Sequence, residues 1–107
     1  MSILKWDKEF ALEQAADDAE LLQELLGIFK ESYRSDLVLL KEGVRLGDAR
    51  QICSASHSIK GAAASLGIEG IREVAMDIEA DSRNGSLTVA NEKIQDMEEM
   101  LLHLLAL

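Results

Sequence analysis

Proline is absent from the 107 residues, and aromatic residues make up only 4% of them. Without proline, no residue forces a helix to kink or break, and a core with so few rings must be built from aliphatic side chains. Hydrophobic residues make up 48% and charged residues 29%, which is typical of a globular chain and not of a disordered one. Strong helix formers dominate, and alternating β-branched runs are missing. We therefore expect an all-α fold with one domain over residues 1–107.

The chain has one cysteine, Cys53, and no long apolar run. A single cysteine excludes an internal disulfide framework and fits a reducing compartment. The first ten residues become acidic too early for a signal peptide, and no apolar stretch is long enough to cross a membrane. These features predict a cytoplasmic protein without a membrane segment.

Basic residues are also scarce, because 11 Lys and Arg stand against 20 Asp and Glu and leave a formal net charge of −9. A field of this sign repels phosphate backbones, so we do not expect a nucleic-acid partner. The acidic residues are spread along the chain, as on solvated helix faces, and do not form one block. We expect a monomer.

Polar residues and glycines mark where the helices begin and end. Asp7 can cap a short first helix, and Asp17 with Glu20 resembles the capping box of a second. Gly47 is suited to end a helix and Asp48 to begin the next one. The predicted helices cover residues 8–15, 18–46, 49–66, 68 to the Asn-Gly-Ser segment at 84–86, and 88–105.

Each of the four long helices carries one apolar stripe. In the second helix the stripe recurs at steps of three and four residues, as an amphipathic helix requires. Short loops between such helices predict an up-down-up-down four-helix bundle. The first helix would lie as a lid over one end, where Trp6 and Phe10 could close the bundle. The stripe of the second helix consists of Leu22, Leu26, Phe29, Tyr33, Leu37, Leu40 and Val44.

His57 lies in the segment SASHSIKGAAASLG, residues 54–67, among unusually small side chains. Since an α-helix turns about 100° per residue, His57 lies about 150° from the centre of the core stripe of its helix. It should therefore face away from the core. The expected core stripe is Ile52, Ala55, Ser56, Ile59, Ala63 and Leu66, and the face that His57 shares contains Arg50, Cys53, Lys60, Gly61 and Ala64.

The neighbours of His57 argue against an ordinary surface histidine. Gly61 in an exposed helix costs about 1 kcal/mol relative to alanine, which a close approach by another molecule would explain. Lys60 is a neighbour at i+3. Beside a neutral imidazole Lys60 gains nothing, so we expect it to have no partner in the resting protein. Beside a phosphoryl group it would offset up to about two negative charges. The pattern suggests that His57 is a nucleophile that accepts a phosphoryl group.

The segment HSIKGAAASLG resembles the H-x-x-K-G signature of histidine-containing phosphotransfer (HPt) domains. DAELLQELLGIFKES is similar to the family's leading long helix and IEADSRNG to a characteristic helix end, so the resemblance covers essentially all 107 residues. It implies a four-helix bundle with an exposed histidine midway along the second bundle helix. It also implies a phosphocarrier without kinase activity or nucleotide site, in which His57 takes a phosphoryl group from a receiver domain's phospho-aspartate and passes it to another receiver.

The resemblance also implies a role for each site residue. His57 would be phosphorylated at Nε2, Lys60 would neutralise the phosphoryl charge, and Gly61 would leave room for the group and the partner. Glu79 would accept a hydrogen bond from Nδ1 of His57 and so orient the ring. Arg83 would either add charge near the phosphoryl group or form an ordinary salt bridge. The expected docking surface for the receiver consists of Gly61, Ala64, Cys53 and Arg50, with contacts from the lid helix.

The expected partners are response-regulator receiver domains or a hybrid sensor kinase. We expect no cofactor of the chain's own, because the receiver would bring Mg²⁺ and the sequence has no clustered ligand set. An adaptor that binds receivers without transferring phosphate is the alternative. A structural bundle or a metal carrier is a third reading, although paired ligands at i, i+4 are missing. The cognate receivers, the direction of phosphoryl flow and membership of a larger hybrid kinase stay open.

Overall fold

The computed structural model describes residues 3–107, and Met1 and Ser2, which the one-domain prediction includes, lie outside the described residues. Within them the chain forms only α-helices, turns and one isolated bridge between Trp6 and Ile68. The all-α prediction is confirmed, and the helix bounds agree with the predicted ranges to within one residue. The helices are α1 (Lys8–Gln14), α2 (Ala19–Leu46), α3 (Ala49–Ser65), α4 (Glu69–Arg83) and α5 (Thr88–Leu105).

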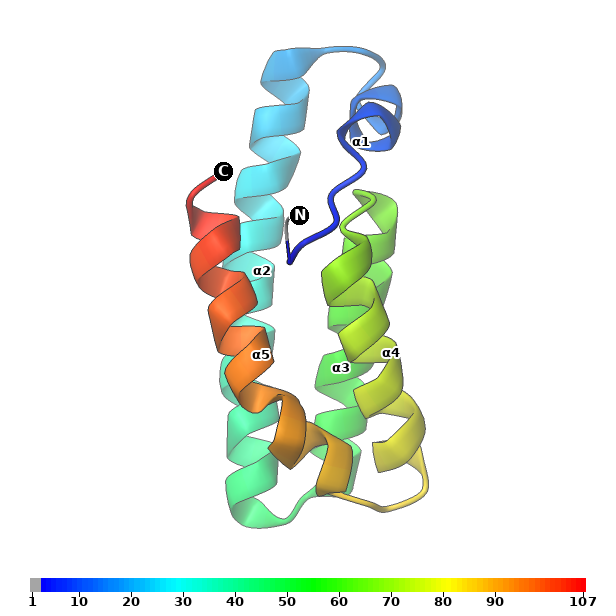
Figure 1. Ribbon diagram of the computed structural model, residues 1–107, viewed down its shortest axis with the longest axis vertical. Helices are drawn as coiled ribbons and strands as arrows, with labels where there is room; N and C mark the ends of the chain where they lie inside the picture. The colour runs from blue at the N-terminus through cyan, green and yellow to red at the C-terminus, as the bar shows by residue number, and fades with distance from the viewer. Residues whose placement is uncertain (1–2) are drawn as a thin grey trace.

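The four long helices form the predicted bundle, in which each packs against the next and α5 packs back against α2 (Figure 1). The short α1 lies across one end, above the turn that joins α3 to α4. None of the described helices combines the length and the apolarity needed to cross a membrane.

Hydrogen bonds attach residues 4–7, which precede α1, to the α3–α4 turn and to the start of α4. The Trp6 indole donates to the Leu66 carbonyl (3.0 Å), and backbone bonds join Asp7 to Gly67 (2.9 Å) and Gly70 to Leu4 (2.8 Å). A Cβ atom at Gly70 would collide with the backbone carbonyl of Ile3. The contact explains why this helix start needs a glycine. Trp6 thus closes this end of the bundle, whereas Phe10 stays 36% exposed.

The core is aliphatic, as the shortage of aromatic residues predicts. All six residues of the expected α3 stripe are buried. Tyr33 is fully buried, and its hydroxyl donates to the Met97 carbonyl (2.6 Å), which links α2 to α5. Met76, by contrast, is 42% exposed, because it falls between the buried positions 75 and 78 on the outward side of α4. Met76 therefore lies outside the core, unlike Met97 and Met100.

The helix caps agree with the sequence at three of four places. Asp7 caps α1, Asp48 caps α3 by accepting from the Gln51 amide, and Gly47 ends α2 in the left-handed region at φ 69°. Asp17 is not the cap of α2. The cap is Asp18, whose side chain accepts from two backbone amides, while Asp17 has a φ of 60° in the turn from α1. The turn uses one more residue than the capping-box pattern indicates.

Candidate functional site

His57 lies midway along α3 with its side chain 68% exposed, on the outward face as the helix geometry predicts. Its Nδ1 atom lies 2.6 Å from Oε2 of Glu79, which belongs to α4. The ring is therefore held from one side by the neighbouring helix while most of it remains accessible.

Glu79 is the buried centre of this site, since its side chain is only 4% exposed. Its Oε1 accepts from Nζ of Lys60 (2.6 Å), and its Oε2 accepts from a terminal guanidinium nitrogen of Arg83 (3.0 Å) as well as facing His57. The hydrogen bond from Lys60 lowers the pKa of Glu79, burial opposes this, and His57 adds to the lowering. The carboxyl group is thus an ionised acceptor at neutral pH.

An ionised carboxylate can only accept hydrogen bonds, so the proton of a neutral His57 ring lies on Nδ1. The lone pair is then on Nε2, the nitrogen that Glu79 does not contact. This arrangement leaves a nucleophilic nitrogen on the exposed side of the ring.

Lys60 differs from the sequence prediction. We expected it to lack a partner in the resting protein, but it is already paired with Glu79. The helix wheel of α3 could not reveal this, because the partner lies on α4 and the pair depends on how the two helices are aligned. For Arg83, of the two roles considered, the structure contains the salt bridge, formed with Glu79 one turn earlier on the same helix.

Gly61 and Ala64 are exposed on the same side of α3 as His57. A Cβ atom added at Gly61 would meet nothing within 4 Å. The packing of the described residues therefore does not require a glycine here, and the bare helix surface beside His57 is open to a partner.

A shallow pocket of about 400 Å³ lies between α3 and α4 on the other side of His57. Cys53 is half-buried there, with its Sγ 3.9 Å from the Glu79 carbonyl. Arg50 is exposed and makes no ion pair within residues 3–107. The pocket thus brings Arg50 and Cys53 together with His57, whereas Lys60, Gly61 and Ala64 are not part of its lining. It is lined by Arg50, Cys53, Ser54, His57, Glu79, Ser82 and Arg83.

Comparison with protein families matches the chain to the Hpt domain over residues 24–107. The chain belongs to the Hpt domain family. The match omits the first 23 residues, which hold α1 and the start of α2, so it is shorter than the resemblance that the sequence suggests. Hpt domains are histidine phosphotransfer modules of phosphorelays. They are phosphocarriers, not kinases, and interact with receiver domains and kinases.

A solved structure supports the fold. It is the crystal structure of the HPT domain from the Hpt sensor hybrid histidine kinase from Shewanella, with a TM-score of 0.77. The match covers 96% of this chain and 92% of that one at 16% sequence identity, so it is an argument for the fold alone. No curated protein matches the sequence.

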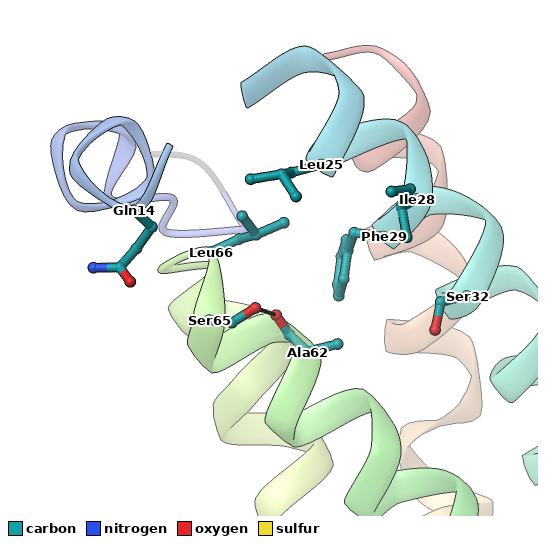
Figure 2. A pocket seen from close by; sticks show the side chains of 8 residues that line it. All are labelled: Gln14, Leu25, Ile28, Phe29, Ser32, Ala62, Ser65 and Leu66. Carbon is teal, nitrogen blue, oxygen red and sulfur yellow. Dashed lines mark hydrogen bonds between the residues drawn. The ribbon is translucent and has the colours of Figure 1, made fainter. Parts of the chain in front are cut away.

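An apolar groove of this Hpt domain was not foreseen from the sequence (Figure 2). It has a volume of about 310 Å³ and lies where α1, α2 and the end of α3 meet. Ile28 lines the groove although the residue is 66% exposed. Ile28 falls outside the α2 core stripe, and this was the signal in the sequence that could have revealed the groove. The lining residues are Gln14, Leu25, Ile28, Phe29, Ser32, Ala62, Ser65 and Leu66.

Proposed function

We propose that this Hpt domain carries phosphoryl groups between receiver domains on Nε2 of His57. The observation that supports this most strongly is an exposed imidazole whose Nδ1 lies 2.6 Å from a buried, ionised carboxylate. A structural histidine in a helix surface does not need such a partner. The Lys60 ammonium beside it supplies the positive charge that a phosphohistidine requires.

In the proposed step, the Nε2 lone pair attacks phosphorus in line with the bond to the receiver's aspartate. The P–N bond forms, the P–O bond breaks, and the aspartate leaves as a carboxylate. The proton remains on Nδ1, so the phosphorylated ring carries a positive charge that Glu79 faces directly. Transfer to the next receiver reverses these bond changes. In the phosphorylated intermediate, the Glu79 carboxylate thus faces the positive ring, and the Lys60 ammonium offsets the negative phosphoryl group.

The receiver is proposed to dock over His57, Gly61 and Ala64 and to extend into the apolar groove of Figure 2. In α3, Gly61 is followed directly by Ala62 of the groove, and Ala64 by Ser65. The surface beside His57 therefore continues into the groove. Arg50 can bind an acidic group of the partner, since it has no ion-pair partner among the described residues.

The decisive experiment mixes the protein with Mg²⁺ and a receiver domain labelled by radioactive acetyl phosphate. We expect label on this protein that is lost in acid and kept in base. His57→Gln should abolish the labelling, and His103→Gln is the matched control, because His103 is the only other histidine and is exposed on α5. Binding of the receiver without labelling would instead support the adaptor.

The supply of Mg²⁺ by the receiver, the absence of a cofactor, the monomeric state and the cytoplasmic location stay predictions. Among residues 3–107, no group of three or more His, Cys, Asp or Glu side chains could hold a metal ion. The same labelling experiment with a receiver lacking its Mg²⁺ ligands checks the first of these predictions, because transfer should then fail.

A further inference from the structure

Glu79 has two cationic partners that contact different oxygens. Lys60 contacts Oε1, whereas Arg83 contacts Oε2, the oxygen that also faces His57. The two cations also differ in exposure, because the Lys60 side chain is 32% exposed and the Arg83 side chain 67%. The carboxylate between them is nearly buried.

The second cation becomes important when Lys60 leaves Glu79 for a phosphoryl group on His57. That movement rests on the proposed function. A phosphoryl group on Nε2 carries up to about two negative charges and competes with Glu79 for the Lys60 ammonium. When Lys60 turns to the phosphoryl group, Oε1 loses its hydrogen bond. A buried carboxylate left without a cation is strongly disfavoured and tends to take up a proton.

Once Lys60 has turned away, the proton on Nδ1 of His57 lies against Oε2 of Glu79 and can move onto it. If Glu79 took it, the phosphorylated ring would become neutral, and a neutral ring is a poorer leaving group for the onward transfer. The remaining cation therefore determines whether the phosphohistidine stays an effective donor.

We propose that Arg83 is a positioning residue that keeps Glu79 ionised and in place when Lys60 turns to the phosphoryl group. Arg83 is suited to this, since guanidinium groups stay protonated at all relevant pH values. It binds Oε2 from the same helix at i, i+4, so the contact does not depend on α3. The other groups near Glu79 are His57 and Lys60 from α3, the Cys53 thiol at its backbone carbonyl, and Arg50 in the lining of the same pocket.

The proposal can be tested without phosphate, because Lys60→Ala imitates the departure of Lys60. NMR titrations of the Glu79 carboxyl carbon and the His57 ring nitrogens would compare the wild type, Lys60→Ala, Arg83→Gln and the double variant. We expect each single variant to raise the pKa of Glu79 modestly. The double variant should raise it by more than the sum of the two and weaken the preference for a proton on Nδ1.

Two results would overturn the proposal. One is an effect of the double variant that equals the sum of the single effects, and the other is Arg83→Lys behaving like Arg83→Gln, since lysine should partly restore the charge. Arg72→Gln is the matched control, because Arg72 pairs with Glu69 on the same helix at 2.6 Å outside the site. It should leave both signals unchanged.

A phosphotransfer assay of Arg83→Gln adds the kinetic readout. We expect donation to a second receiver to slow several-fold, with acceptance changed less. Equal slowing of both directions would instead indicate that Arg83 acts directly on the phosphoryl group and would contradict the proposal. The titrations use the unphosphorylated protein, so a protein that never becomes labelled would remove the proposed function and leave the result for Arg83 and Glu79 standing.

Discussion

Nδ1 of His57 and Oε2 of Glu79 lie 2.6 Å apart and connect the outward face of α3 to the buried side of α4. The pair joins an exposed ring to a carboxylate that is only 4% exposed. Such a contact restricts the ring rotation and the proton position together, because the carboxylate cannot donate and cannot follow a rotating ring into solvent. The orientation of the His57 ring is therefore set by a residue of the neighbouring helix.

Glu79→Ala should remove this control. We expect the protein to bind receivers as before but to accept phosphoryl groups about tenfold more slowly, because a smaller share of His57 rings would present the Nε2 lone pair in the right orientation. ¹⁵N NMR of His57 should show a larger share of the Nε2-protonated tautomer. An unaltered tautomer ratio would contradict the role assigned to Glu79.

Stability should depend on pH through the same residue. The pKa of Glu79 is lower in the folded protein, first because of its hydrogen bond with Lys60. The ionised Glu79 therefore adds its full contribution to the free energy of unfolding above about pH 4.3, the ordinary glutamate pKa. This contribution is lost as the pH falls through the lower pKa that Glu79 has in the folded protein. Urea unfolding of the wild type and Glu79→Gln between pH 7 and 3 would measure it. We expect the difference in free energy of unfolding to shrink at the acidic end, and a constant difference would contradict the lowered pKa.

Lys60→Ala should slow phosphotransfer about tenfold, which corresponds to about 1.4 kcal/mol of lost stabilisation for one partly exposed charge. The fold should remain intact, as far-ultraviolet circular dichroism can show. Lys93→Ala is the control, because Lys93 pairs only loosely with Asp96 (3.8 Å) on α5. Equal transfer rates for wild type and Lys60→Ala would exclude the charge-neutralising role.

Gly61 offers a test that separates folding from docking. Because a Cβ there meets nothing, Gly61→Ala should raise the free energy of unfolding by up to about 1 kcal/mol through helix propensity. Gly61→Gln should also fold but should slow transfer by blocking the partner. Gly27, whose surroundings on α2 are equally open, is the control, and Gly27→Gln should leave transfer unchanged. If Gly61→Gln transfers at the wild-type rate, the open surface is not the docking site.

Ile28→Asp should weaken receiver binding about tenfold, or about 1.4 kcal/mol, because it places a charge in the apolar groove. Its effect on stability should be small, since Ile28 is 66% exposed. Val38→Asp is the matched control on the same helix, because Val38 is 60% exposed but lines a different groove, between α2 and α5. Titration calorimetry with a receiver would compare them, and equal affinities would place the docking surface elsewhere.

The amino-acid sequence by itself determined which segments are helical and which face of each helix is buried. Both properties are local, because capping residues such as Asp7 and Asp48 act within one turn and the 3.6-residue period positions His57 relative to Ile59 without any other helix. The shift of the α2 cap from Asp17 to Asp18 is the kind of error that a turn of uncertain length produces.

Only the tertiary structure decided what lies between helices. Glu79 was assigned to the imidazole by family resemblance, but its pairing with Lys60 depends on the alignment of α3 against α4, which the packing of their buried faces sets. The groove around Ile28 likewise exists only because α1, α2 and α3 meet there. The sequence therefore determines that His57 faces solvent, whereas the packing of the bundle determines which charges surround it.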